Sequence, residues 1–481
     1  MKHIYTTFLV LLISLGLSAQ DLWVAKVKQN GKYGYINTAG KAVIPAQYDF
    51  IEGFTNGLAP VQKDGKWGYI DKTGAIIVPL QYDYAYSFID GIAEVKKDGK
   101  FGFVDMRGKV IVTPQYDRVR PPMEGIWAVQ KDGKWGFMSK TGQELVPPKY
   151  TYVRTFSDGM AAVNEGGAMA GENNATGGKW GFVNATGAEV IPLQWEDARD
   201  FSEGFAPVRK TGLYGYIDKT GKLVIPAQFK SAGIFIDGVA IVEKIGKFGF
   251  INKAGKMITA PQFDLVASNC TEGCRTVQKA GKSGFVDQSG KVLVLPAYED
   301  VRNFSEGLAA VKKGGKWGYV DKVGTIIIPI GYDYGNNFNN GMAVVKKAGK
   351  WGAIDKTGKF IIQPLYEDLG WYFSDGVAYM RKGGKYGFVD LNGNVVVEPK
   401  YQEVKDFYMG LAAVNLDGKW GYVDKTGREI VVPQFDSGDN FVEGFARVSR
   451  EGKWGFIDRT GKFIAVPQFE EAEPFTNLNK R

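Results

Sequence analysis

Histidine and cysteine are almost absent from this chain, and their scarcity excludes several classes of enzyme. Among 481 residues the one histidine is His3, and the two cysteines are Cys270 and Cys274. His3 lies in a segment that we expect to be removed, so a Ser-His-Asp or Cys-His mechanism is excluded. Two cysteines are also too few for a structural zinc site. We predict no catalytic residues, no metal site and no cofactor, and expect that the protein is not an enzyme.

Long hydrophobic runs are missing too, apart from a short one at the N-terminus. Lys2 precedes the mostly apolar residues 4–17, and Leu17-Ser18-Ala19 offers a small residue before a cut at Gln20. A run of about fourteen residues is short of the roughly 20 that a membrane-spanning helix needs. The pattern is typical of a secretory signal peptide over residues 1–19. We therefore predict an exported protein, without a membrane span, in the periplasm, at the cell surface or secreted.

Glycine, by contrast, is abundant, with 64 residues, and it marks a repeat along the whole chain. An aromatic residue precedes glycine at a nearly constant spacing, and Ser283-Gly284 fills the one gap. The spacings between the thirteen glycines are 34, 34, 34, 45, 34, 34, 35, 34, 34, 35, 34 and 34. The pairs are Tyr33-Gly34, Trp67-Gly68, Phe101-Gly102, Trp135-Gly136, Trp180-Gly181, Tyr214-Gly215, Phe248-Gly249, Trp317-Gly318, Trp351-Gly352, Tyr386-Gly387, Trp420-Gly421 and Trp454-Gly455. Thirteen copies at one period indicate a repeat architecture.

Each repeat reads as three short strands followed by an irregular link. In the copy that begins at Leu58, residues 58–62, 66–71 and 75–78 alternate as strands do, separated by turns at Asp64-Gly65 and at 71–74. Asp-Gly is a strong hairpin signal, and Pro79 cannot donate to a ladder, so it ends the third strand. Apolar side chains fall on both faces of the strands. Repeats must therefore stack to bury them.

These features predict an all-β fold for residues 20–481. We expect thirteen 34-residue, three-stranded meanders in an elongated solenoid or superhelix. A double β-propeller is the alternative, because propellers typically have 4 to 8 blades. The spacing of 45 places an insertion within 165–178, EGGAMAGENNATGG, which we expect to be a flexible loop and which could either bind a ligand or be a tolerated surface insertion.

The motif K-W-G-[YF]-[IV]-D-K-T-G-K, followed by [IV]-P-x-Q-[YF]-[DE] and F-x-[ED]-G-[LFM]-A-x-V, resembles the WG or KWG repeat family of bacterial proteins. The resemblance covers about residues 21–475. It implies a binding or scaffold role, with no agreed catalytic residues. The motif is only loosely similar to choline-binding repeats, whose period is nearer twenty residues.

Two readings of the aromatic residues remain open. Seven tryptophans could stack on sugar rings as an exposed row, or pack between repeats as large aromatic side chains usually do. They are Trp67, Trp135, Trp180, Trp317, Trp351, Trp420 and Trp454. Tyrosine, phenylalanine and serine occupy the same place in other copies, which favours packing.

Charged residues recur at the turns. Lysines such as Lys63, Lys66 and Lys72 could form rows that bind phosphate groups. Neighbouring acids reduce the positive potential of these rows, so a role in solubility is favoured. Nine aspartates share one turn position, and a turn role explains all of them better than catalysis or calcium binding. They are Asp71, Asp105, Asp218, Asp287, Asp321, Asp355, Asp390, Asp424 and Asp458.

Cys270 and Cys274 replace apolar residues of one loop. An exported protein meets an oxidising compartment, so we predict a disulfide between them, with buried free thiols as the alternative.

Together these patterns predict a non-enzymatic repeat protein that offers an extended binding or scaffold surface to protein partners at the cell envelope. A glycan- or cell-wall-binding module that uses the tryptophans and lysines is the alternative. Export makes nucleic acid an unsuitable partner. The oligomeric state stays open.

Overall fold

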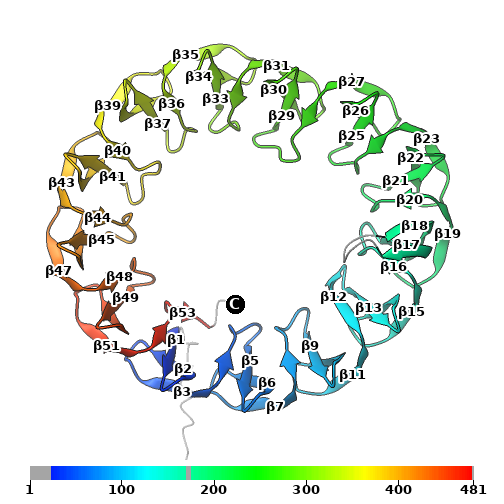
Figure 1. Ribbon diagram of the computed structural model, residues 1–481, viewed down its shortest axis with the longest axis horizontal. Coiled ribbons are helices and arrows are strands. Elements are labelled where there is room, and N and C mark those ends of the chain that lie inside the picture. Colours follow the sequence, from blue (N-terminus) through cyan, green and yellow to red (C-terminus); the bar gives the residue numbers. More distant parts are fainter. Residues whose placement is uncertain (1–22, 170–174, 479–481) are drawn as a thin grey trace, which may run out of the picture.

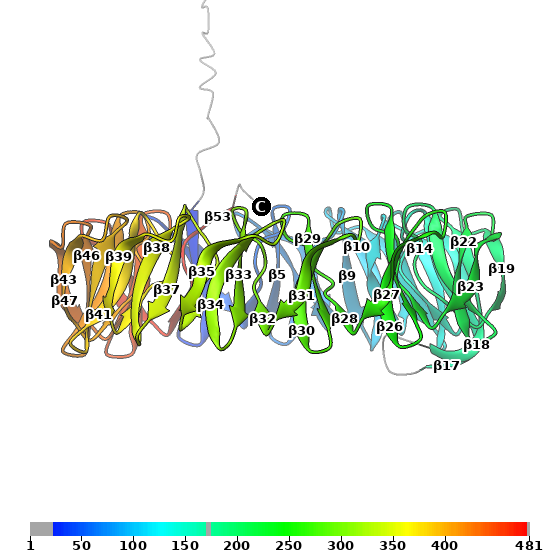
Figure 2. The same cartoon turned by 90° about the horizontal axis from the view of Figure 1, so that it is seen from above.

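The computed structural model describes residues 23–169 and 175–478 and shows one closed ring of thirteen β-sheets, which we call blades 1 to 13 (Figure 1). The predicted signal peptide at 1–19 lies outside the described residues. Seen from the side, the ring is a flat band (Figure 2). No helix of the described residues is long and apolar enough to cross a bilayer.

Each blade is an antiparallel meander of four strands, to which blade 1 adds a fifth short strand, and the strand at each of the four positions has a characteristic length. The first strands, mostly of two residues, are β52 (Glu471–Ala472), β4 (Phe50–Ile51), β8 (Tyr84–Ala85), β12 (Arg118–Met123), β16 (Tyr152–Val153), β20 (Asp197–Ala198), β24 (Ser231–Ala232), β28 (Leu265–Val266), β32 (Asp300–Val301), β36 (Tyr334–Gly335), β40 (Asp368–Leu369), β44 (Glu403–Val404) and β48 (Ser437–Gly438). The second strands are β1 (Trp23–Gln29), β5 (Leu58–Lys63), β9 (Ile92–Lys97), β13 (Ile126–Lys131), β17 (Met160–Met169), β21 (Phe205–Lys210), β25 (Val239–Lys244), β29 (Cys274–Lys279), β33 (Leu308–Lys313), β37 (Met342–Lys347), β41 (Val377–Lys382), β45 (Leu411–Leu416) and β49 (Phe445–Arg450).

The third strands carry the aromatic–glycine motif. They are β2 (Lys32–Asn37), β6 (Lys66–Asp71), β10 (Lys100–Asp105), β14 (Lys134–Ser139), β18 (Ala175–Asn184), β22 (Leu213–Asp218), β26 (Lys247–Asn252), β30 (Lys282–Asp287), β34 (Lys316–Asp321), β38 (Lys350–Asp355), β42 (Lys385–Asp390), β46 (Lys419–Asp424) and β50 (Lys453–Asp458). The fourth strands form the outer rim of the ring (Figure 1): β3 (Ala42–Tyr48), β7 (Ile76–Tyr82), β11 (Val110–Tyr116), β15 (Glu144–Tyr150), β19 (Glu189–Trp195), β23 (Leu223–Phe229), β27 (Met257–Phe263), β31 (Val292–Tyr298), β35 (Ile326–Tyr332), β39 (Phe360–Tyr366), β43 (Val395–Tyr401), β47 (Glu429–Phe435) and β51 (Phe463–Phe469).

The all-β class and the thirteen repeats are confirmed, but the three-stranded unit is wrong. The link after the third predicted strand supplies a further short strand, which pairs with the next repeat: Tyr84 lies opposite Lys96, and Ala85 lies opposite Val95. Two residues are too few to show an alternating pattern in the sequence. Loops between first and second strands point toward the centre of the ring (Figure 1), and we call them the inner loops.

The core is divided among the thirteen interfaces between neighbouring blades. One buried cluster lies at each interface, and one of them contains Leu58, Trp67 and Tyr69 of blade 2 with Ala93 and Val95 of blade 3. The cluster between blades 13 and 1 completes the circle, with Phe456 and Phe475 packed against Ala25 and Val27. Burial of apolar area between blades is thus the main stabilising term.

Closure of the ring joins the two ends of the described chain. β1 pairs on one side with β2 and on the other with β52 and β53 (Thr476–Asn477), so the C-terminal strands complete blade 1. The propeller alternative is therefore the one observed. It is a single ring of thirteen blades instead of an open solenoid or two rings, because the rotation between blades adds up to one full turn over thirteen repeats.

The insertion continues a hairpin. β17 and β18 have ten residues each, and Glu165–Lys179, Gly167–Gly177 and Met169–Ala175 are paired, so the expected flexible loop within 165–178 is largely strand. Its residues 170–174 lie outside the described part. The extended ends of β17 and β18 lie at one face of the ring (Figure 2).

Candidate functional site

The aromatic rings of the repeat motif pack between blades and do not form an exposed row. Trp67 contacts Tyr84 of the next blade, with ring centroids 4.7 Å apart. Five of the seven predicted binding tryptophans are at most 8% exposed: Trp67, Trp135, Trp180, Trp317 and Trp420. The other two, Trp351 and Trp454, are half-buried. These tryptophans therefore pack between repeats, as the second of the two readings holds, and do not form an exposed row.

The glycine after each ring lies under the backbone of the fourth strand. A Cβ at Gly68 would lie 2.4 Å from the Val78 carbonyl oxygen and 2.8 Å from that of Pro79. The register between β6 and β7 shifts at this point, between Trp67 and Tyr69. Glycine is required at this position because the backbone of the fourth strand occupies the space that a Cβ atom would need.

Basic side chains cover many of the rings and tie each blade to the next. The Arg120 guanidinium lies 4.2 Å from the centroid of Trp135 and donates to the Val153 carbonyl at 2.8 Å. Other covered pairs are Arg154 with Trp180, Arg199 with Tyr214, Arg302 with Trp317, Lys405 with Trp420 and Arg447 with Trp454. Such contacts contribute about 0.5–2 kcal/mol each. These rings are closed off from a stacking ligand.

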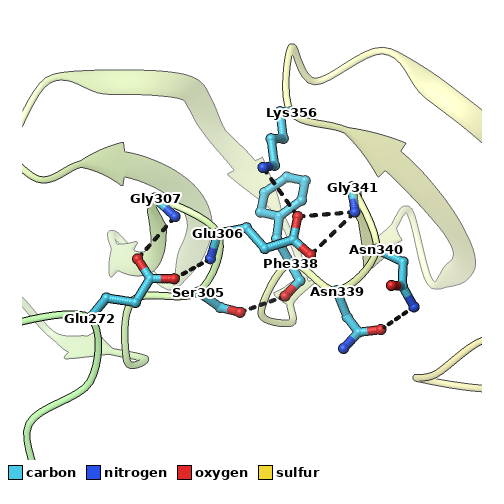
Figure 3. Close-up of polar contacts among 9 residues, drawn as sticks. All are labelled: Glu272, Ser305, Glu306, Gly307, Phe338, Asn339, Asn340, Gly341 and Lys356. Carbon is cyan, nitrogen blue, oxygen red and sulfur yellow. Dashed lines mark hydrogen bonds and ion pairs between the residues drawn. The ribbon is translucent and has the colours of Figure 1, made fainter.

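Acidic residues of the inner loops link neighbouring loops (Figure 3). Glu272 accepts hydrogen bonds from the amides of Glu306 (2.5 Å) and Gly307 (3.1 Å), and Glu306 accepts one from the Gly341 amide (3.0 Å) and pairs with Lys356. The same contact joins Glu124 to Gly159, Asp158 to Gly204, Glu203 to Gly238 and Asp375 to Gly410. A hydrogen bond from Lys253, aided by the Gly238 amide, lowers the pKa of Glu203. The acids therefore link each inner loop to the next.

A second series of acids lies on the opposite face, at the links between blades. Asp83 accepts from Lys66 of the preceding blade at 2.8 Å and from the Asp98 amide of its own blade at 2.7 Å. The hydrogen bond from Lys66, followed by that from Asp98, lowers the pKa of Asp83. Lys63 donates to Gln47 at 3.1 Å. Part of the lysine row thus serves to hold neighbouring blades together.

The nine turn aspartates close the turns between third and fourth strands, as predicted. Asp218 Oδ1 accepts from the Thr220 hydroxyl at 2.5 Å and from the amides of Thr220 and Lys222. The hydrogen bond from the Thr220 hydroxyl lowers the pKa of Asp218. The other eight carboxylates accept at the same turn position.

Both cysteines are free thiols, so the disulfide that we predicted between Cys270 and Cys274 is not formed in the structure. Cys274 is buried, and its Sγ lies 3.8 Å from the Glu272 carbonyl oxygen. Cys274 matches the alternative prediction of a buried free thiol, because it belongs to the apolar cluster between blades 8 and 9.

Exposed aromatic and apolar side chains occur on several inner loops, and two adjacent loops together carry four of them, a feature that the sequence analysis missed. Trp371 (47% exposed) and Tyr372 (63%) lie in the loop of blade 11, and Tyr408 (47%) and Met409 (39%) lie in that of blade 12. We call these four residues the inner-loop patch. One sequence signal points to this patch. The spacing between Gly352 and Gly387 is 35 instead of 34, so the repeat that contains Trp371 and Tyr372 has one additional residue.

Hydrogen bonds hold the two loops of the patch together. The Gly410 amide donates to Asp375 at 2.5 Å, and the Ser374 hydroxyl donates to the Phe407 carbonyl at 2.5 Å. Trp371 also stacks on Tyr334 of blade 10, with centroids 6.3 Å apart and an interplanar angle of 29°. The exposed rings are therefore held on a fixed framework, which lowers the entropic cost of binding.

Comparison with known proteins agrees with the repeat seen in the ring. The WG containing repeat matches the chain thirteen times, over residues 33–67, 67–101, 101–135, 135–167, 180–214, 214–248, 248–282, 284–317, 317–351, 351–386, 386–420, 420–454 and 454–477. The chain belongs to the WG containing repeat family. The resemblance inferred from the sequence motif is thus confirmed. No curated protein matches this WG repeat chain.

Several solved structures share a distant likeness with the WG repeat ring. One is the extracellular domain of a hybrid two-component system from B. thetaiotaomicron, 10% identical, covering 91% of this chain and 75% of that one, with a TM-score of 0.24. Another is PorZ of Porphyromonas gingivalis, described as a bacterial surface component of the type-IX secretion system, 10% identical, covering 93% and 82%, with a TM-score of 0.24. Likenesses this weak carry no argument about what the ring does.

Proposed function

We propose that this WG repeat ring is a non-enzymatic, exported scaffold that binds a protein partner through its inner loops. The observation that carries the proposal is the inner-loop patch, which presents four exposed aromatic or apolar side chains on two adjacent loops. Aromatic residues and methionine are enriched at the centres of protein interfaces. Tyr and Trp anchors also supply most of the binding energy in many complexes.

The charged residues of the repeat support a scaffold over an enzyme. The acids of the inner loops, links and turns accept hydrogen bonds from backbone amides or pair with lysines, and these contacts recur from blade to blade. A catalytic pair would stand apart from its equivalents in other repeats. Export rests on the N-terminal signal-peptide pattern, and it places the partner at the cell envelope.

Site-specific photo-crosslinking in the producing cells tests the proposal. A photoreactive amino acid at Tyr372 or Tyr408 should trap the same discrete protein, because both positions belong to one patch. Leu295 is the matched control, since it is 74% exposed but lies on the outer strand β31. The absence of an adduct at the patch, or the same adducts at Leu295, would contradict a protein-binding role for the inner loops.

A further inference from the structure

A cavity lies beside the inserted hairpin, far along the chain from the inner-loop patch. It has a volume of about 650 Å³ and lies between blades 5 and 6. Three arginines and three acids line it: Arg154, Arg199, Arg209, Glu196, Asp197 and Asp200. A volume of this size is typical of sites for small molecules.

The insertion forms one wall of this cavity. Thr176 and Gly177, in the extended part of β18, line it, and the Asn164 side chain holds the hairpin by donating to the Gly177 carbonyl at 3.1 Å. The insertion is the source of the spacing of 45, so no other repeat has this wall. Blade 9 is a suitable reference without the insertion. Its residues 299–307, EDVRNFSEG, are nearly identical to residues 196–204, EDARDFSEG, of blade 6.

Most polar groups of the cavity are held in place by the protein itself. Arg154 Nε donates to the Ala198 carbonyl at 3.1 Å, and the Tyr214 hydroxyl donates to Asp197. The Arg199 guanidinium lies 5.2 Å from the ring centroid of Tyr214. These contacts fix the lining before any ligand arrives, as a specific binding site requires.

Among the residues that line the cavity, two buried side-chain atoms have no hydrogen-bond partner in the described part of the chain. They are the acceptor Asp200 Oδ1 and the donor Arg209 Nε. Arg209 Nε lies 3.7 Å from Glu196 Oε2, which is too long for a hydrogen bond. Leaving such a group unsatisfied costs about 1–3 kcal/mol. Burial also raises the pKa of Asp200, against the opposing effect of Arg154.

The chemistry of the lining selects the ligand. Three cations and three acids give no net formal charge, so the acids repel an anion and the arginines repel a cation. The unpaired acceptor and donor call for a group that can both donate and accept, which a hydroxyl does. Neighbouring hydroxyls of a sugar can meet a carboxylate and a guanidinium at once. We propose that this cavity binds a neutral polyhydroxylated ligand of the size of a mono- or disaccharide. This site is separate from the inner-loop patch and does not depend on the proposed protein partner.

Titration calorimetry of the purified full chain tests the proposal, with maltose, cellobiose and N,N′-diacetylchitobiose as neutral probes and inorganic phosphate as the anionic one. We expect at least one sugar to bind and phosphate not to bind. Asp200→Ala and Arg209→Met should each weaken sugar binding at least tenfold. Asn303→Ala and Lys312→Met, at the equivalent positions of blade 9, are matched controls and should leave it unchanged.

A third variant keeps the test decisive if Asp200→Ala or Arg209→Met does not fold. Thr176 is exposed on the hairpin, so Thr176→Trp should fold normally while its indole fills the cavity and abolishes sugar binding. The proposal is overturned if none of the three sugars binds or if phosphate binds in their place. It is also overturned if the blade 9 controls weaken binding as much as the blade 6 variants, or if Thr176→Trp binds sugar normally.

Discussion

Gly68 offers the sharpest test of why the repeat needs an aromatic residue followed by glycine. In Gly68→Ala the new methyl group would lie 2.4 Å from the Val78 carbonyl oxygen, whereas real Cβ atoms stay beyond 3.0 Å. The contact is with backbone, so β7 must shift as a unit and cannot simply turn a side chain away. Overpacking of this kind costs about 1–3 kcal/mol.

Hydrogen exchange measured by mass spectrometry can show whether the destabilisation by Gly68→Ala is confined to blade 2. Since each 1.4 kcal/mol is about tenfold in an equilibrium constant, amides of β6 and β7 should exchange roughly 5- to 150-fold faster than in the unmodified protein. Peptides from blade 8, on a distant part of the ring, serve as the internal reference and should be unchanged.

Gly53→Ala is the matched control in the same blade. A Cβ at Gly53 has no atom within 4 Å, so the change should be neutral or stabilising by up to about 1 kcal/mol. Equal exchange in β6 and β7 of the two variants would refute the explanation that the fourth strand needs glycine beneath it.

Three further predictions concern the core, the closure and the response to pH. Trp180→Ala should lower the free energy of unfolding by about 3–5 kcal/mol because the ring is buried, whereas Trp371→Ala should stay within about 0.5 kcal/mol; similar denaturation midpoints would contradict this. Ending the chain at Phe469 removes β52 and β53 and should open the ring, with a larger radius of gyration in X-ray scattering; an unchanged radius would contradict closure by these strands. Burial raises the pKa of Glu94 from 4.5 to about 7, so the folded state holds this proton more tightly than the unfolded state and stability falls as the pH rises from 4.5 to 7. Glu94→Gln should remove up to about 3 kcal/mol of that fall, and an equal pH dependence in both proteins would disprove it.

The sequence predicts the three longer strands of each repeat and the turns between them because their signals are local. Asp64-Gly65 adopts the positive φ angles of a two-residue hairpin turn, and the nine aspartates close their turns as the pattern indicates. The role of Gly68 in close backbone approach also follows from its place inside a strand. These features depend on residues a few positions apart, where the pattern and the chemistry coincide.

The arrangement of the blades could not be predicted in the same way. Whether thirteen repeats form an open solenoid or a closed ring depends on a small rotation at every interface, which no single repeat encodes. Ring closure depends on residues as distant as Val27 and Ala472, which lie opposite each other. The first strand of each blade, such as Tyr84–Ala85, is too short to show a pattern.

The sequence marks the candidate sites only as departures of the repeats from their consensus, and it left open whether the insertion within 165–178 binds a ligand. The additional residue near Trp371 and the insertion before Trp180 change the spacing, but the spacing alone does not say whether a departure binds anything. The exposure of Tyr372 and the unpaired Asp200 Oδ1 become visible only in three dimensions.

Electron microscopy of the isolated protein tests the central claim most directly. Averaged views down the axis should show one closed ring of thirteen blades, with the C-terminal strands completing the blade that holds β1 (Figure 1). An open arc, or two smaller rings, would contradict both the closure and the arrangement of inner loops on which the proposed binding surface depends.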